Sequence, residues 1–222
     1  LAGIVSASQK TLPHEVTVHH NKDLAEAYAA EEGRLSDEAI AAASRDDIPL
    51  EATHVPDCDL ITMGVDVASV RALNVRVSAY RLPANGLPTK RSLYMGMVND
   101  FGKVAELMER YGVNMCCVDH EPDGRLARQL AERFPGRVYL AHFITPRSET
   151  AFKVNPEMRS VGVRRTDVLD AVFDSIRQQR NLLPMEKPAG WAKQMQALNR
   201  IRTEQSDGGV RGEYRSVAAD DY

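Results

Sequence analysis

LITMGVDVAS, residues 60–69, is the stretch that decides the fold, because it has the apolar content of a buried strand and carries one acid, Asp66, inside it. A second apolar run, VNMCCVD at residues 113–119, ends on Asp119. An ionised carboxylate in such a setting is costly unless a cation lies beside it. Lysine and arginine are scarce around both acids, so we expect a divalent metal ion to supply the positive charge.

Outward from these two runs, the pattern is that of an α/β protein. Apolar and polar residues alternate along residues 74–82, as in a half-exposed strand. Asn85-Gly86 is a turn signal, and residues 92–98 form the returning strand of that hairpin. Together with residues 60–69, these segments predict an antiparallel meander of three strands. Helices and strands then alternate, which implies parallel pairing in the second half of the sheet. The expected order is helix 100–112, strand 113–119, helix 123–136 and strand 137–143.

Three further segments are expected beyond residue 150. Residues 153–163 form a small hairpin or an irregular insertion, residues 191–205 a helix, and residues 208–218 a turn followed by a strand. Between them, residues 166–179 form a helix capped by Thr166. Its expected buried stripe is Val168, Leu169, Val172, Phe173 and Ile176, and its expected solvated acids are Asp167, Asp170 and Asp174.

The first part of the chain differs from the rest. It is rich in alanine and charge, and it predicts two short helices split at Gly33, the second capped by Ser36. We therefore expect residues 1–55 to be a helical linker or peripheral segment and residues 56–222 to be the functional domain. The chain begins with Leu1, and we expect it to be a fragment of something longer.

Composition excludes some classes of protein. The 222 residues carry a net charge of −3 and are 43% hydrophobic, which is ordinary for a globular protein and unlike one held on nucleic acid by charge alone. No apolar stretch approaches the ~18 residues of a membrane span, and no secretory signal opens the chain. The cysteines lack zinc-site spacing, so we interpret them as buried free thiols: Cys58, Cys116 and Cys117.

Four acids form the candidate site. Asp66 and Asp119 would meet at one edge if their strands are neighbours, and Asp220 with Asp221 would join them from the C-terminal element. Two Mg²⁺ or Mn²⁺ ions held ~4 Å apart by such carboxylates hydrolyse phosphoesters by in-line displacement. Each acid taken alone also has a structural interpretation, as a satisfied strand acid, a cap or a solvated pair.

The order of elements and acids resembles the ribonuclease-H-like fold: a mixed sheet, with an antiparallel three-strand meander followed by parallel strands, flanked by helices. Over residues 58–222 the chain is similar to the nuclease domain of the large terminase subunit of tailed bacteriophages. The segments that carry the resemblance are ITMGVDVAS (61–69), VDHEPDGRLARQLAERFPGRVYLAHF (118–143), VGVRRTDVLDAVFDSIRQQRNLLP (161–184) and EYRSVAADDY (213–222).

The resemblance implies a metal-dependent endonuclease that cuts concatemeric double-stranded viral DNA during genome packaging. By motif, Asp66, Asp119 and Asp220 match metal ligands, and Asp221 assists or replaces Asp220; Glu121 is a reserve ligand. The implied partners are DNA, the terminase small subunit and the portal protein, in the cytoplasm of the infected bacterial host, with no membrane. We expect the fragment to be a monomer.

DNA contacts and competing functions stay open at this point. The candidate phosphate-binding bases are Lys153, Arg125, Arg128, Arg164 and Arg165, each of which is also interpretable as a solvated surface base. One alternative is another nuclease of the same fold, of the resolvase or transposase type. The other is a non-catalytic module that docks a packaging motor to its portal or small subunit.

Overall fold

The protein is described by a computed structural model, which divides the chain into two compact units. Residues 39–189 form the larger unit, and residues 1–38 with 190–222 form the smaller. The described residues are 33–69, 71–121, 124–144, 152–204 and 210–216. The expected first helix and the acidic pair at 220 and 221 lie outside these ranges.

The larger unit is built on a nine-stranded mixed sheet, in the order β1-β9-β4-β3-β2-β5-β6-β8-β7. The expected meander is present, because β2, β3 and β4 pair antiparallel, and β5, β6 and β8 then continue parallel from β2. The strands are β1 Ser44–Arg45, β2 Leu60–Ser69, β3 Ala72–Arg81, β4 Thr89–Val98, β5 Met115–Asp119, β6 Val138–Phe143, β7 Phe152–Asn155, β8 Ser160–Val163 and β9 Asn181–Pro184.

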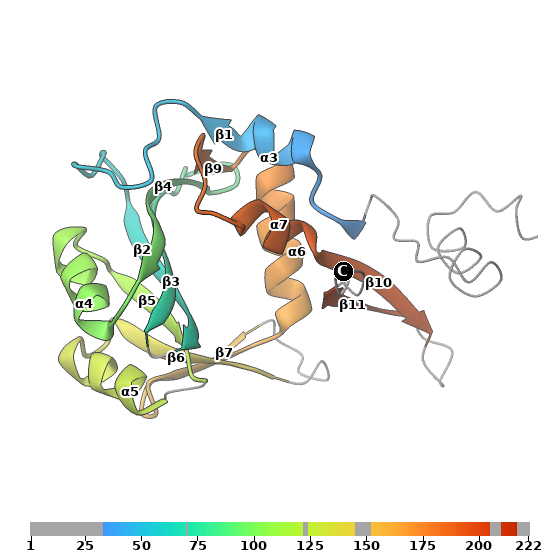
Figure 1. Ribbon diagram of the computed structural model, residues 1–222. Coiled ribbons are helices and arrows are strands. Elements are labelled where there is room, and N and C mark those ends of the chain that lie inside the picture. The colour runs from blue at the N-terminus through green and yellow to red at the C-terminus, as the bar shows by residue number, and fades with distance from the viewer. Residues whose placement is uncertain (1–32, 70, 122–123, 145–151, 205–209, 217–222) are drawn as a thin grey trace, which may run out of the picture. The chain divides into compact units, whose positions relative to one another are not determined.

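Helices flank this sheet, as Figure 1 shows: α4 (Phe101–Arg110) and α5 (Gly124–Arg133) lie on one side, and α6 (Arg165–Arg177) lies on the other. The main core forms between the sheet and α4 and α5. On α6, Phe173 and Ile176 are fully buried. The expected class, an α/β protein with a mixed sheet flanked by helices, is confirmed, and the architecture is consistent with a ribonuclease-H-like fold.

Local sequence explains where the helices beside the core begin and end. The Asp100 carboxylate accepts a hydrogen bond of 2.8 Å from the Lys103 amide and so caps α4. Gly112 follows that helix at φ +61°, a left-handed conformation that favours glycine. Ser36 directly precedes α3 (Asp37–Ala43), as expected. Its side chain hydrogen-bonds Glu38, and together with a backbone hydrogen bond this lowers the pKa of the Glu38 carboxyl.

The structure corrects two expectations for α6. The N-cap position is occupied by Arg164, without a side-chain cap, and not by Thr166. Val168 is 41% exposed and does not belong to the buried stripe. The buried face of the helix is centred on Phe173 and Ile176, and Val168, five residues before Phe173 and so about 140° away around the helix, falls at the solvent edge.

Two boundaries also differ from expectation. The helix expected over 191–205 is short: α7 spans Trp191–Gln196, and β10 (Leu198–Glu204) pairs antiparallel with β11 (Val210–Ser216) in a separate ribbon.

Residues 39–55 belong with the sheet rather than with a peripheral segment. Ser44 of β1 pairs with Leu183 of β9, and Ala52 is buried in the main core.

A Schellman-type turn ends α6 and leads the chain into β9. Gln179 has φ +54°, a left-handed conformation at a non-glycine residue. Its amide donates to the Ile176 carbonyl at 2.9 Å, and the Arg180 amide donates to the Ser175 carbonyl at 2.8 Å. A side chain in this conformation costs roughly 1–2 kcal/mol.

We predict that Gln179→Gly stabilises the protein by ~0.5 kcal/mol, because the relieved backbone strain exceeds the added chain entropy. Gln178→Gly is the matched control, since Gln178 has φ −83° and gains nothing from glycine. It should destabilise by ~0.5–1 kcal/mol. Urea denaturation of both variants measures the difference, and equal destabilisation would contradict the assignment of strain to position 179.

Candidate active site

Asp66 and Asp119 lie on neighbouring strands of the larger unit. β2 and β5 pair parallel, with Val65 aligned to Val118. Both valines are buried in the main core, at 4% and 0% exposure. Successive side chains alternate between faces and adjacent strands lie ~5 Å apart. The next residue of each strand, Asp66 and Asp119, therefore projects from the opposite face, side by side with the other.

One oxygen of each carboxylate is held by a neighbouring amide. The Asn74 side chain, across the β2–β3 pair, donates from Nδ2 to Asp66 Oδ2 at 3.0 Å. The Glu121 backbone amide donates to Asp119 Oδ1 at 3.3 Å. Asp66 is exposed and Asp119 is half-buried. Both acids are thus oriented by hydrogen bonds on a face that a ligand can reach.

The sheet face beside these acids is open. Gly64, two residues before Asp66, is exposed, and a Cβ placed on it would meet nothing within 4 Å. A glycine inside a strand marks a place where another group approaches the backbone closely. Cys117, aligned with Gly64, is half-buried, and burial raises the pKa of its thiol. A protonated thiol is a poor nucleophile and a poor metal ligand.

The donor set fits a hard divalent cation in part. Mg²⁺ and Mn²⁺ prefer carboxylate oxygen and retain several waters, and Asp66 with Asp119 offers two such groups on one face. Asp220 and Asp221 lie outside the described residues. Within the described ranges, no group of three or more His, Cys, Asp or Glu side chains could hold a metal ion.

The loop after Asp119 is packed closely around a histidine. The His120 amide donates to the Ala141 carbonyl at 3.1 Å, which extends the β5–β6 pairing by one residue. A Cβ on Gly124 would lie 2.7 Å from His120 Cε1, so any larger residue at the start of α5 would oblige the ring to shift. Glu121, the expected reserve ligand, is exposed.

Arg165 is the expected DNA-binding base that the structure brings to the same face as the acids. Its guanidinium lies 6.0 Å from the ring centroid of Phe143. Phe143 shares the face of Ala141, which is aligned with Asp119. Arg164, one residue earlier, forms an ion pair with Asp167. That acid is half-buried, so the expectation that it belongs to a solvated face is wrong.

The other expected bases are placed elsewhere. Arg125 and Arg128 are exposed on α5, the helix that covers the opposite face of the sheet. Lys153 is exposed on β7 and aligned with Gly162. Gly162 is in turn aligned with His142, which alternates away from the face of Asp119. The structure therefore separates these three bases from the acids.

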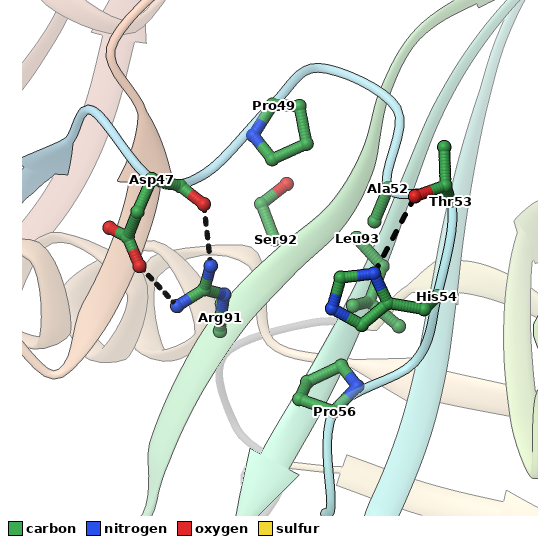
Figure 2. Close-up of a pocket in the computed structure, with 9 residues that line it drawn as sticks. All are labelled: Asp47, Pro49, Ala52, Thr53, His54, Pro56, Arg91, Ser92 and Leu93. Carbon is green, nitrogen blue, oxygen red and sulfur yellow. Dashed lines mark hydrogen bonds and ion pairs between the residues drawn. The ribbon is translucent and has the colours of Figure 1, made fainter.

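A small cavity of about 80 Å³ lies where the loop before β2 crosses β4 (Figure 2). The Arg91 guanidinium there donates to the Asp47 carboxylate at 2.9 Å and to the Asp47 carbonyl at 2.6 Å. This contact lowers the pKa of the Asp47 carboxyl. The Arg91–Asp47 pair is internally compensated, and the walls include Pro49, Pro56 and the His54 imidazole. Asp66 and Asp119 do not line this cavity, so it is not the candidate site.

Asn74 and Gly64 were not anticipated as site residues. The sequence does contain a hint of the role of Asn74, because polar and apolar side chains alternate along residues 74–82 and place Asn74 on the polar face. A tight connection between β2 and β3 pairs Asp66 with Asn74. That register depends on where β2 ends and β3 begins, and the sequence between Ser69 and Ala72 has no strong turn marker.

No family model matches the chain, and no curated protein matches it either. Among the described residues, none of the helices has the length and apolar character needed to cross a membrane. The fold and the residue geometry therefore carry the functional argument.

We predict that Gly64→Ala leaves stability unchanged or slightly raised, because its Cβ meets no atom within 4 Å. Gly64→Phe should also fold, but it should weaken Mn²⁺ binding and any activity of the site by at least ~10-fold, because the ring occupies the open face beside Asp66. Thermal melts and Mn²⁺ titration of both variants measure this. Equal Mn²⁺ affinity for both variants would show that the open face is not part of the site.

Proposed function

We propose that the chain is a divalent-metal-dependent endonuclease that cleaves double-stranded DNA. The observation that carries the proposal is the register of β2 against β5, which sets Asp66 and Asp119 side by side on an open sheet face. Asp66 lies inside β2 and Asp119 ends β5, and neither acid forms an ion pair that the structure describes. They do suit the binding of cations that act on a phosphodiester.

The chain's own residues orient the reaction. Asp66 and Asp119 would hold the ions, and Asn74 fixes the Asp66 carboxylate by its hydrogen bond to Oδ2. Gly64 leaves room for the scissile phosphate to approach the strand. Bound at the carboxylates, a pair of Mg²⁺ or Mn²⁺ ions would supply an activated water and stabilise charge on the leaving oxygen. The family resemblance suggests Asp220 or Asp221 as a further ligand, and both lie outside the described residues.

The proposed substrate follows from the shape of the face. Arg165 is exposed and lies on the same face as Asp119, where it can contact a phosphate beside the one being cleaved. An open sheet face with a flanking base suits a duplex backbone rather than a small ligand enclosed on all sides.

The more specific proposal is that this nuclease belongs to a viral DNA-packaging terminase. The segments at residues 118–143 and 161–184 support it by their resemblance to that family. In that setting the substrate is concatemeric DNA, the partners are the terminase small subunit and the portal protein, and the location is the cytoplasm of an infected bacterium.

We predict that Asp66→Ala abolishes Mn²⁺-dependent nicking of plasmid DNA, with a fall of at least ~100-fold, while the melting temperature changes little. Asp66 is exposed, so its removal costs little stability, but half of the paired carboxylate set is lost. A gel assay with Mn²⁺, Mg²⁺ and EDTA checks the result. Asp174→Ala is the matched control, because this exposed acid lies on α6 and should retain full activity.

Retained cleavage in Asp66→Ala would refute the assignment. A wild-type chain that neither cleaves DNA nor gains thermal stability from Mn²⁺ would instead favour the docking module. Cleavage confined to branched DNA would favour a resolvase-type enzyme, since a packaging nuclease should accept linear duplex.

We predict that Asn74→Ala weakens Mn²⁺ binding by ~10-fold and lowers activity to a similar degree, because partners that orient a ligating carboxylate typically contribute 10–100-fold, in order of magnitude. Isothermal titration with Mn²⁺ measures the affinity. An Asn74→Ala protein with wild-type affinity would mean that the hydrogen bond to Asp66 has no positioning role.

A further inference from the structure

A group of cationic side chains gathers on the same sheet face, toward the end of the sheet where β4 meets β9. Arg76 of β3 donates from Nη2 to Asn181 Oδ1 at 2.6 Å. Lys90 of β4 is aligned with Tyr80 of β3 on one side and with Asn181 of β9 on the other. Because aligned residues of adjacent strands share a face, the Arg76, Lys90 and Asn181 side chains lie together.

Two buried donors in this group have no acceptor among the described residues. Asn181 is 0% exposed and its Nδ2 forms no hydrogen bond. Arg76 as a whole is half-buried, but its Nε atom is buried and also forms no hydrogen bond. The Asn181 side-chain oxygen accepts the hydrogen bond from Arg76, which leaves its amide nitrogen as the donor without an acceptor. Buried donors without acceptors are rare in folded proteins and each requires an explanation.

Among the described residues, no carboxylate compensates the charges in the group, and the Lys90 ammonium instead lies 5.7 Å from the centroid of the Tyr80 ring. In the described part of the chain, Arg76, Lys90 and Arg180 form no ion pair with a carboxylate. Burial, together with the charges of Arg76 and Arg180, lowers the pKa of Lys90 to about 8. Burial lowers the pKa of Arg76 to about 10. The fold therefore holds positive charge in a place where its own residues disfavour it.

The backbone fixes the group rigidly. The left-handed Gln179 ends α6 and turns the chain so that Arg180 and Asn181 enter β9. The Lys90 amide donates to the Arg180 carbonyl at 2.7 Å, which locks β4 to this turn. Arg180 Nη1 also donates to the Pro88 carbonyl at 3.1 Å. The donors are thus pre-positioned and do not depend on a mobile side chain finding its place.

We propose that Arg76, Lys90 and Asn181 form an oxyanion site that binds a phosphate group. A phosphate presents several acceptor oxygens and up to two negative charges, so it can accept from the amide and the guanidinium while compensating the ammonium. Lys90 is only partly buried, so the group is reachable from solvent. The site does not rest on the proposed nuclease function, since none of its residues belongs to the acidic pair.

The test compares melting temperatures in sodium phosphate and in sodium chloride at equal ionic strength, for the wild type and Lys90→Met. In chloride, Lys90→Met should melt higher than the wild type, because an uncompensated charge is removed. Phosphate should raise the melting temperature of the wild type more than that of Lys90→Met, so that the difference between the two shrinks or changes sign. The affinity for phosphate should be at least ~10-fold weaker in the variant. Lys103→Met is the matched control, since Lys103 is exposed and pairs with Glu106.

Phosphate also stabilises proteins in general, because it is excluded from their surface. The Lys103→Met control measures this general effect, so that it can be distinguished from binding at Lys90. An equal phosphate response in the wild type, Lys90→Met and Lys103→Met would overturn the proposal and leave water as the partner of the donors. Should Lys90→Met fail to fold, ammonium NMR of the wild type decides instead: added phosphate must raise the pKa of Lys90 above its value in chloride, and an unchanged pKa overturns the site.

A duplex-binding arm identifies the source of the phosphate. If Lys90→Met also weakens binding of a short DNA duplex in anisotropy titrations without metal, the ligand is a backbone phosphate. If only inorganic phosphate is affected, the ligand is a free phosphate or a small phosphorylated molecule. Asp66→Ala should leave the phosphate response intact, so this site and the proposed nuclease fail or succeed separately.

Discussion

The parallel pairing of β2 with β5 is the constraint on which the proposed chemistry depends. Val65 and Val118 must both be buried against α4 and α5, and this requirement fixes the register more firmly than the hydrogen bonds do. A slip of one residue would carry every side chain of the strand to the other face, so an acid would enter the core at a cost of several kcal/mol. Hydrophobic burial on one face thus places the carboxylates on the other, and the core and the site are two consequences of one register.

Charge on the open face is kept apart rather than neutralised. Arg76 lies on the same face as Asp66, one pair of aligned residues further along β3. Its guanidinium nevertheless donates to Asn181, away from the acid. Asp66 is held instead by the neutral Asn74 amide, which orients the carboxylate without cancelling its charge. An arginine ion pair here would have removed the affinity for a cation, and the structure avoids it by giving Arg76 a different partner.

The sequence predicted the strands that carry the acids, because β2, β3, β4 and β5 are long or flanked by clear turns and caps such as Asn85-Gly86 and Asp100. It failed where pairing depends on distant residues. β1 and β9 have two and four residues, too few for a period to appear, and they exist because each completes the other at the sheet edge. β10 was interpreted as helix because its strand character comes from pairing with β11. The sequence does not predict Asn74 as a site residue for a related reason, since its role depends on its cross-strand partner, Asp66.

Uncompensated charge is the common feature of the two proposed sites, and their separation bears on whether one ligand could reach both. Asp66 is aligned with Asn74, and Lys90 is aligned with Tyr80. These positions are six residues apart on β3, which is roughly 20 Å at ~3.3 Å per residue. A DNA strand advances ~3.4 Å per phosphate along its axis, so a duplex lying along β3 would place several phosphates between the acids and Lys90. However, α6 has its fully buried side on this half of the sheet. A free phosphate is far smaller than a duplex and is less hindered by a neighbouring helix, so the duplex-binding comparison separates the two ligands.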